Sequence, residues 1–285
     1  MIDTTMLRVH LQLPDVCNMR PECRGCSTAH QRAGRLLTPA QAQDWWQAIT
    51  WLRGQHGRLH IVALWGEPTA DPILMELLRR AARDNIVEIV SNLVDLGELE
   101  NVPRRADCRL VASYHPHAWA GTEVFWERVM EARRLAWNVY YILLVGYPGE
   151  LESTVQDRDW FLEHGEQVAI MPFGGTLGRR LYPRDWSAAD WAILAGDLER
   201  NWGRSDLMRP GTALRGMPCL AGSRYLWIGK DGKAQACYQP GSPVLGNVLQ
   251  RDLRLLTEPM ACPYPNCMCP DQWAYIVGKV PQTAE

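Results

Sequence analysis

Three cysteines near the start of the chain have a spacing that can hold a metal. Cys17, Cys23 and Cys26 follow one another as C-x5-C-x2-C, directly after a segment of strand length. Three thiolates on one loop can bind three irons of a four-iron cluster, which leaves the fourth iron open to a small ligand. His30 follows Cys26 at a spacing that also suits a tetrahedral Cys3His zinc site. The loop alone therefore predicts a metal site and leaves iron–sulfur and zinc open.

A second group of cysteines lies in the last part of the chain. This region is short and rich in turns, so it buries little apolar surface and needs a metal to hold it together. A zinc ribbon is one reading, but the paired C-x2-C knuckles of that fold are absent. Cys108 stands apart from both groups and is expected to be a small buried apolar residue. The five cysteines of the last region are Cys219, Cys237, Cys262, Cys267 and Cys269.

Small and polar residues follow three further strand-like segments. Gly66-Glu67-Pro68 comes after the second segment, Ser91-Asn92 after the third, and Ser113-Tyr114-His115 after the fourth. The carboxyl ends of parallel strands lie on one rim, where α/β folds place their sites. We therefore expect these residues to face the same rim as the cysteine loop.

Segments with the hydrophobic period of a strand alternate with segments that have the period of a helix over residues 7–175. Several strand-like segments are apolar almost throughout, as in a parallel sheet that is covered on both faces. Six β–α units are fewer than the eight of a closed barrel, so the sequence predicts an α/β fold with a partial (βα)6 TIM-like barrel. The predicted strands are 7–13, 59–65, 86–90, 109–113, 139–145 and 168–173.

Capping residues predict where the intervening helices begin. An N-cap side chain followed by proline, or by a partner three residues on, is the signal. A further helix is expected around residues 125–137. The predicted caps are Thr38 with Pro39 and Gln41, Asp71 with Pro72, Ser153 with Gln156, and Ser187 with Asp190.

The pattern changes after residue 175. A Pro- and Gly-containing stretch follows the last predicted helix, and short turn-rich segments come after it. Residues 225–228 and 233–237 read as a hairpin that turns at Asp231-Gly232. The predicted organisation is a barrel over residues 1–205 and a small cysteine-rich domain of β-hairpin and helix over residues 206–285.

The composition narrows the function classes. The 285 residues are 47% hydrophobic and 22% charged, as in ordinary globular proteins. A net charge of −2 disfavours a nucleic-acid partner. No segment approaches the ~20 apolar residues of a membrane helix, and the start lacks a signal peptide, so we expect a cytoplasmic protein. In a reducing compartment, nine cysteines indicate metal binding or catalysis before disulfides.

The cysteine loop and the Gly66-Glu67-Pro68 turn together resemble the radical SAM superfamily, over residues 7 to about 175. The resemblance implies a [4Fe-4S] cluster on Cys17, Cys23 and Cys26, with S-adenosylmethionine bound to the open iron. It implies that the Gly-Glu-Pro turn binds the amino group of that cofactor, which needs carbonyl or carboxylate acceptors. By the same resemblance, Ser91, Asn92 and Ser113 are candidates for binding its ribose and carboxylate.

Two features depart from the family pattern. The family's commonest spacing is C-x3-C-x2-C, and here the first gap is five residues, which indicates a longer loop. The family usually has an aromatic residue before the third cysteine, beside the adenine, and here that residue is Gly25. We therefore expect the adenine to be held near Pro172 and Phe173.

The C-terminal cysteines resemble the SPASM extension, or its shorter form Twitch, which binds an auxiliary iron–sulfur cluster. The short region favours Twitch with one further [4Fe-4S] cluster. The predicted ligands are Cys219, Cys237, Cys267 and Cys269, which leaves Cys262 as the spare. A spare cysteine could return a hydrogen atom to a substrate radical, so Cys262 is a candidate catalytic residue.

The resemblance implies reductive cleavage of S-adenosylmethionine to a 5′-deoxyadenosyl radical, which abstracts a hydrogen atom from the substrate. An auxiliary cluster could then accept an electron, giving oxidation, while Cys262 would give epimerisation. Tyr114 and His115 are candidates for proton transfer or substrate binding, together with His117 and Trp119. The implied electron donor is an external protein of flavodoxin or ferredoxin type.

The expected substrate is a small polar metabolite such as a sugar, an aminocyclitol or a nucleoside. The reason is that the barrel is expected to begin within about six residues of the start, which leaves no room for a leader-peptide recognition domain. A radical SAM enzyme that modifies a ribosomally made peptide is the first alternative. A non-enzymatic zinc module that binds RNA or protein is the second.

Overall fold

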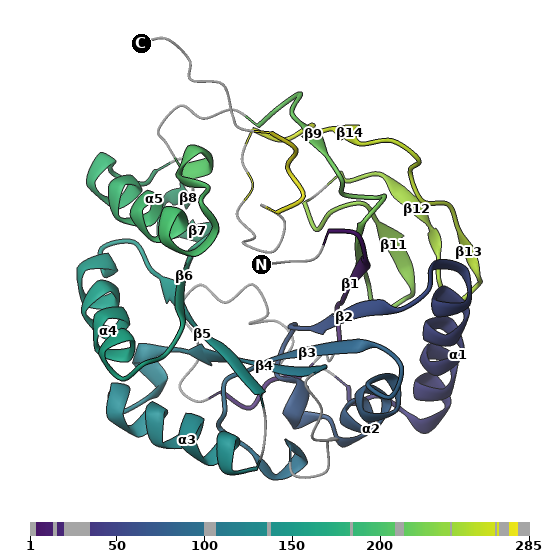
Figure 1. Cartoon of the computed structure of the whole chain (residues 1–285), viewed down its shortest axis with the longest axis horizontal. Coiled ribbons are helices and arrows are strands. Elements are labelled where there is room, and N and C mark those ends of the chain that lie inside the picture. The colour runs from purple at the N-terminus through teal and green to yellow at the C-terminus, as the bar shows by residue number, and fades with distance from the viewer. Residues whose placement is uncertain are drawn as a thin grey trace.

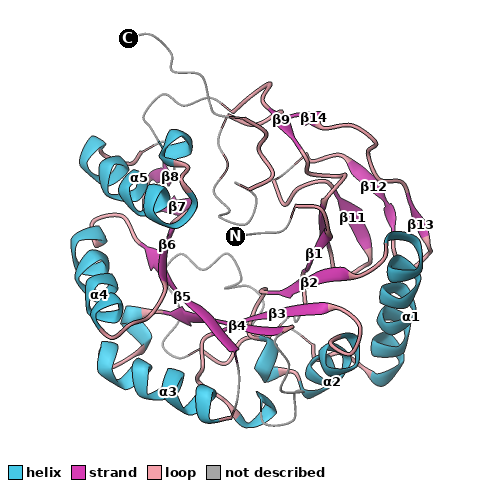
Figure 2. Cartoon of the chain, in the orientation of Figure 1, coloured by secondary structure: helices cyan, strands magenta, loops and turns pink. Residues whose placement is uncertain are grey.

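The computed structural model describes residues 4–13, 16–19, 35–99, 107–135, 138–182, 185–208, 214–239, 241–265, 267 and 274–278. Six parallel strands form a curved sheet, and helices cover its outer side (Figures 1 and 2). The predicted partial barrel is therefore confirmed. The six strands are β1 (Leu7–Leu11), β2 (Leu59–Ala63), β3 (Ile86–Ser91), β4 (Cys108–Tyr114), β5 (Asn138–Gly146) and β6 (Val168–Pro172).

Helices and short 3-10 turns connect and follow these strands. The helices are α1 (Pro39–His56), α2 (Pro72–Ala81), α3 (Thr122–Arg134), α4 (Leu151–Glu163) and α5 (Ala188–Trp202). The 3-10 turns are η2 (Pro68–Ala70), η3 (Gly97–Leu99), η4 (Pro116–Ala118) and η5 (Ser205–Met208).

The C-terminal strands continue the barrel sheet. The order in the ten-stranded sheet is β13-β12-β11-β10-β1-β2-β3-β4-β5-β6, and β10 pairs in parallel with β1. The predicted hairpin is confirmed as β10 and β11, but its attachment to the first strand was not predicted. The domain boundary at residue 206 stays a prediction, since one sheet spans it. The remaining strands are β7 (Gly175–Leu177), β8 (Arg180–Tyr182), β9 (Pro218–Cys219), β10 (Tyr225–Ile228), β11 (Lys233–Gln235), β12 (Val244–Asn247), β13 (Asp252–Leu253) and β14 (Met260–Ala261).

Three of the four predicted helix caps are confirmed. Thr38 and Ser187 each form a capping box, and Asp71 caps α2 through two backbone N–H groups. The prediction at Ser153 is wrong, because α4 already begins at Leu151. The Ser153 hydroxyl donates to the Glu150 carbonyl, at 2.9 Å, so it is satisfied inside the first turn.

Alternation along the strands separates an outer core from the barrel interior. Leu7, Val9 and Leu11 point outward and pack with the helices in one large cluster. A much smaller apolar layer lies inside the barrel, where Val111, Leu143 and Ala169 meet. The residues between the outward-facing ones on β1 are polar, so part of the barrel interior is charged.

A close backbone approach fixes the end of the C-terminal sheet. Gly246 has a φ of +131°, and a Cβ there would lie 1.9 Å from the Asp252 carbonyl oxygen. We expect Gly246→Ala to destabilise the protein by more than ~2 kcal/mol, since strain and a steric clash add. Gly241→Ala is the control, because its φ is +80° but nothing lies within 4 Å, and it should cost about 1 kcal/mol. Urea unfolding measures both, and equal losses would contradict the clash.

Candidate functional site

The first part of the cysteine loop is tied to the rim of the barrel. Cys17 is half-buried, whereas Cys23, Cys26 and His30 lie outside the described residues. The Glu67 N–H donates to the Val16 carbonyl at 2.8 Å. The Asn92 side-chain amide donates to Asn18 Oδ1 at 2.9 Å. The loop is therefore attached to the carboxyl ends of β2 and β3, as the sequence predicts.

Asp71 attaches the chain on the far side of this loop. Its Oδ2 accepts from the Leu37 N–H at 2.8 Å, and its Oδ1 accepts from Ile73 and Leu74 at the start of α2. Asp71 is fully buried. One short segment, residues 67–71, thus holds both ends of the loop in place.

Glu67 organises the rim with its carboxylate. The group is buried and accepts from the Thr69 hydroxyl at 2.8 Å and from the Asn92 N–H at 2.7 Å. Burial raises the pKa of Glu67, while these hydrogen bonds act in the opposite direction. Since the carboxylate is already engaged, an ammonium group at the Gly66-Glu67-Pro68 turn would have to be bound by backbone carbonyls. Gly66, at a φ of +65°, gives the turn its left-handed conformation.

Ser91 and Asn92 shape the next loop. The Ser91 hydroxyl accepts from the Leu93 N–H at 3.1 Å, and Asn92 Oδ1 accepts from the Val94 N–H at 2.9 Å. Leu93 has a φ of +59°, which only a well-supported turn tolerates in a bulky residue. The structure places both side chains at the predicted rim with these loop-forming contacts, and their part in cofactor binding stays a prediction.

An arc of polar and aromatic side chains continues around the rim. Ser113 Oγ lies 3.0 Å from His115 Nε2, and the His115 and His117 rings are 6.2 Å apart. His117 contacts the Tyr147 ring at 5.7 Å, and Tyr147 contacts Phe173 at 5.5 Å. The arc joins the carboxyl ends of β4, β5 and β6. Phe173 is thus on the rim, where an adenine contact is predicted.

Electrostatics limits what His115 can do. Burial, and then the neighbouring His117, lower the pKa of His115 to about 4. A neutral imidazole at neutral pH can accept a proton or a hydrogen bond, but it cannot act as a general acid.

Tyr114 does not belong to this arc, so the prediction that placed it on the rim is corrected. Alternation along β4 turns Ser113 toward the interior and Tyr114 toward the helices. The Tyr114 ring packs 5.1 Å from Phe125 and 5.4 Å from Phe161 in the outer core. Trp119 also contacts Phe125, at 5.3 Å. Both residues support the helices.

Asp157 lies in this outer layer with an unfavourable charge. Burial, and then Glu123, raise its pKa from 3.8 to about 6. Because the pKa is raised, the folded protein binds this proton more tightly than the unfolded chain does. Protonation of Asp157 therefore stabilises the folded state at low pH, and this stabilisation is lost as pH rises from about 4 through 6. We expect Asp157→Asn to be more stable than wild type by about 1 kcal/mol at pH 8 and to lose that advantage near pH 4. Melting temperatures across pH measure this, and a constant difference would contradict it.

Four C-terminal cysteines meet at one small cavity. Cys219, Cys237, Cys262 and Cys267 line it, together with aromatic and aliphatic side chains. Three short segments bring them together, since β9 pairs with β14 and the Cys262 N–H donates to the Met217 carbonyl at 2.8 Å. Cys269 lies outside the described residues. The structure therefore places Cys262 with the predicted ligands rather than apart from them.

The cavity needs a cation to keep its thiols ionised. Burial is the main cause that raises the pKa of Cys219 to about 11; the Ala221 N–H acts in the opposite direction, and the nearby Cys262 adds to the rise. Thiolates at such positions form when a metal compensates their charge. Among the described residues, no three His, Cys, Asp or Glu side chains lie close enough together to bind a single metal ion. This finding does not choose between zinc and a four-iron cluster, and four thiolates are a donor set that suits either.

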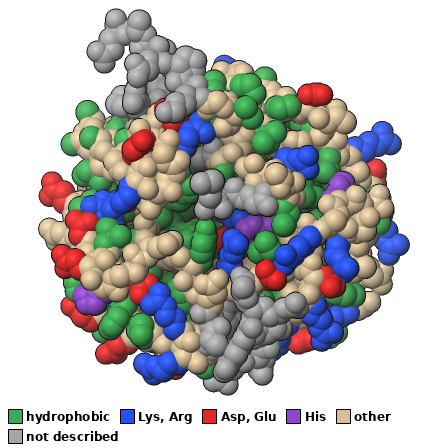
Figure 3. Space-filling view, viewed as in Figure 1, with side chains coloured by type: hydrophobic (Ala, Val, Ile, Leu, Met, Phe, Trp, Pro, Cys, Tyr) green, Lys and Arg blue, Asp and Glu red, His purple; other side chains and the backbone are tan. Residues whose placement is uncertain are grey.

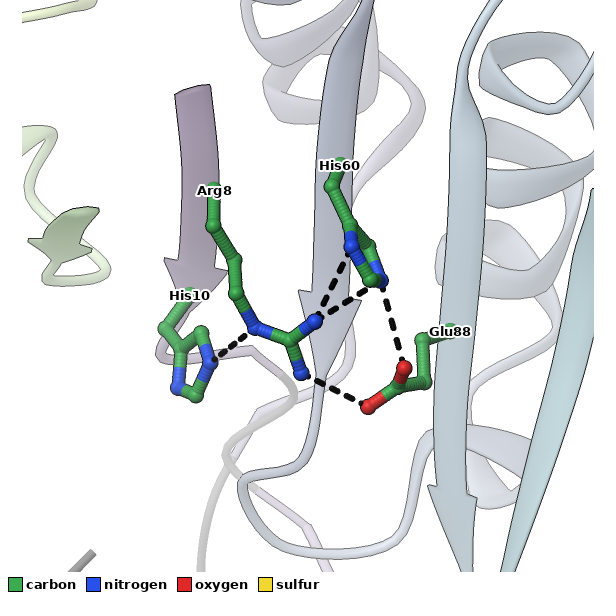
Figure 4. Close-up of polar contacts among 4 residues, drawn as sticks. All are labelled: Arg8, His10, His60 and Glu88. Carbon is green, nitrogen blue, oxygen red and sulfur yellow. Dashed lines mark hydrogen bonds and ion pairs between the residues drawn. The ribbon is translucent and has the colours of Figure 1, made fainter. Parts of the chain in front are cut away.

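A polar cluster that was not predicted lies inside the barrel (Figure 4). Arg8 Nη2 donates to Glu88 Oε1 at 2.8 Å, and Arg8 Nε donates to His10 Nε2 at 3.2 Å. His60 Nδ1 lies 2.9 Å from Arg8 Nη1, and His60 Nε2 lies 3.2 Å from Glu88 Oε2. All four residues are buried. The sequence did contain a signal for this cluster, because Arg8 and His10 alternate with apolar residues in a strand of a sheet expected to be covered on both faces.

This polar cluster touches the wall of the cysteine cavity. The His10 ring lies 4.8 Å from Tyr225, and Tyr225 lies 5.5 Å from Tyr275. Both tyrosines line the cavity with the four cysteines. The pairing of β10 with β1 makes this contact, so the barrel and the cysteine-rich segment form a continuous packed unit there.

Comparisons with known proteins identify relatives by fold. No family model matches the sequence, and no curated protein matches it. SuiB of Streptococcus suis, bound to S-adenosylmethionine, superposes with a TM-score of 0.62 at 15% identity over 87% of this chain. Native anSMEcpe with bound AdoMet and the Cp18Cys peptide gives 0.57 at 15% identity over 87% of this chain and 79% of its own. The chain spans 64% of the length of SuiB.

These matches show that the chain shares the fold of SuiB and of anSMEcpe, two proteins whose structures hold S-adenosylmethionine. The match extends over most of the chain rather than over the barrel alone. Among the described helices, none has the length and apolar character needed to cross a membrane.

Proposed function

We propose that this protein is a radical SAM enzyme that acts on a small polar metabolite. The observation that carries the proposal is the rim itself. In a fold shared with radical SAM enzymes, the cysteine loop is tied by Glu67 and Asn92 to the two strand ends expected to bind S-adenosylmethionine. Cys17, Cys23 and Cys26 would hold the first [4Fe-4S] cluster.

When bound and reduced, this cluster supplies the electron that cleaves S-adenosylmethionine to a 5′-deoxyadenosyl radical. The protein's own residues supply position and a dry site. The turn at Gly66 would bind the amino group of S-adenosylmethionine through backbone carbonyls. Glu67 would hold that turn against Asn92. Phe173 and Tyr147 would lie against its adenine. An external flavodoxin- or ferredoxin-type protein would deliver the electron.

We assign the auxiliary cluster to Cys219, Cys237, Cys262 and Cys267. This set holds Cys262 in place of the predicted ligand Cys269, because Cys262 lines the shared cavity. A fully thiolate-ligated cluster can accept an electron from a substrate, which favours a net two-electron oxidation. Epimerisation through Cys262 would require a cysteine that is not a ligand.

The rim arc supports a polar substrate. The neutral His115 and the Ser113 hydroxyl form a pair that can accept and donate hydrogen bonds, as a hydroxylated substrate requires. When an alcohol is oxidised, such a substrate loses one hydrogen atom, one proton and one electron. The hydrogen atom would go to the 5′-deoxyadenosyl radical and the electron to the auxiliary cluster, and His115 is a candidate acceptor of the proton.

Modification of a peptide is the second candidate. It is favoured by the likeness to anSMEcpe, whose structure holds the Cp18Cys peptide. Titration of the reconstituted protein with short peptides and with sugars or nucleosides would separate the two.

Anaerobic reconstitution, followed by reduction in the presence of S-adenosylmethionine, tests the proposed activity. We expect 5′-deoxyadenosine to form and to disappear in the triple variant Cys17→Ala, Cys23→Ala, Cys26→Ala. Cys108→Ala is the matched control, since Cys108 is buried at the start of β4 away from both cysteine groups. A triple variant that still cleaves S-adenosylmethionine would refute the assignment.

A further inference from the structure

A hollow of about 120 Å³ opens at the amino end of the barrel, where the strands begin. Arg8 and Glu88 lie at its floor, and Arg109 of β4 lines its side. The exposed Gln167 and Asn201 lie at its edge. Figure 3 shows blue, purple and red side chains near the centre of the face drawn. The hollow is thus lined by charged side chains at a buried floor and by exposed residues at its edge.

An apolar layer separates this hollow from the rim with the cysteine loop. Along β4 the inward residues are Arg109, Val111 and Ser113, and Val111 belongs to the apolar interior layer. Four residues of strand place Arg109 about 13 Å from Ser113 along the barrel axis. A ligand in the hollow would therefore be distinct from the reactants at the rim.

The charges around the hollow do not cancel. Glu88 is engaged by Arg8 through one oxygen and by His60 through the other. Burial, and then Arg8, lower the pKa of His60, so this histidine adds no charge at neutral pH. Arg109 lies over the Tyr140 ring at 5.0 Å, and its register partner on β3 is Glu88, the carboxylate already paired with Arg8. Two guanidinium groups and one carboxylate line the hollow, so it carries one positive charge in excess.

We propose that the hollow is a binding site for a small carboxylate or phosphate anion, held by Arg109. A guanidinium fork matches two oxygens of either group. The Gln167 and Asn201 amides at the edge offer further N–H donors, and the phenol of Tyr141, which also lines the hollow, offers an O–H donor. Because the site lies below the apolar layer, occupancy stabilises the barrel without contributing to the chemistry at the rim.

Thermal unfolding of the reconstituted full chain, without S-adenosylmethionine, tests this site. Inorganic phosphate and malonate are titrated separately against chloride at matched ionic strength. We expect a rise of several degrees in melting temperature with at least one anion, and the responding anion identifies the group. Arg109→Gln should lose the rise. Arg134→Gln, which removes the charge of an exposed arginine of α3, should keep it.

Equal rises in wild type and Arg109→Gln, or no rise with either anion, would overturn the proposal. If Arg109→Gln is too unstable to measure, Gln167→Glu decides, because it adds a carboxylate at the exposed edge. A full rise in that variant would also overturn it. Melting temperature does not depend on cleavage of S-adenosylmethionine, so this test can fail without affecting the proposed activity.

Discussion

The Cys262→Ala variant is expected to lose the auxiliary cluster and to hold about four irons per chain instead of about eight. The reason is that Cys262 lines the cavity with Cys219, Cys237 and Cys267, and a four-iron cluster in a thiol site needs four ligands. Iron and acid-labile sulfide after anaerobic reconstitution measure the loss. Formation of 5′-deoxyadenosine should persist, because the first cysteine loop is untouched.

Cys108→Ala is the control and should keep all its iron. A different result for Cys262→Ala would bear on the mechanism. If Cys262→Ala keeps about eight irons and cleaves S-adenosylmethionine but yields no product, then Cys262 would be the hydrogen-atom donor of an epimerase rather than a ligand. The iron content thus decides whether Cys262 is a cluster ligand, which favours oxidation, or a hydrogen-atom donor, which would give epimerisation.

The Glu88→Gln variant is expected to be less stable than wild type by about 3–5 kcal/mol. Glu88 and Arg8 form an ion pair of 2.8 Å, with side chains 3% and 2% exposed. Removing the carboxylate leaves a buried guanidinium without its counter-charge, which costs far more than a surface ion pair would. Calorimetric melting of wild type and variant at one pH and one metal content measures the loss.

A second change separates the ion pair from simple packing. In the double variant Glu88→Gln, Arg8→Met, no charge is left unpaired, so part of the lost stability should return. An exposed pair provides the comparison, because Asp84→Asn breaks the Arg53–Asp84 contact and should cost less than ~1 kcal/mol. Similar losses for Glu88→Gln and Asp84→Asn would show that the interior is hydrated.

The barrel elements could be predicted because their signals are local. The capping boxes at Thr38 and Ser187 and the apolar runs of β2 and β6 depend on neighbours within a few residues. The prediction at Ser153 was wrong because it also depended on a local signal alone. A serine followed by glutamine three residues later fits a cap, but Glu150 and Leu151 start the helix earlier through tertiary contacts of the apolar face.

What could not be predicted depends on contacts between distant segments. The sequence placed Glu67, Asn92 and Ser113 at one rim, since parallel strands share their carboxyl ends. It did not reveal that Glu67 holds the loops with its carboxylate, nor that Cys262 shares a cavity with Cys219. Tyr114 was misplaced because strand direction was considered without the inward and outward alternation.

The parallel pairing of β10 with β1 has a consequence for the order in which the protein can assemble. Arg8 pairs with Tyr225, so the first strand remains an open edge until most of the chain has left the ribosome. Contacts this distant in sequence are slow to form. A nascent or truncated chain that stops before residue 225 would present that edge, together with the buried arginine, to other molecules and would be prone to aggregate.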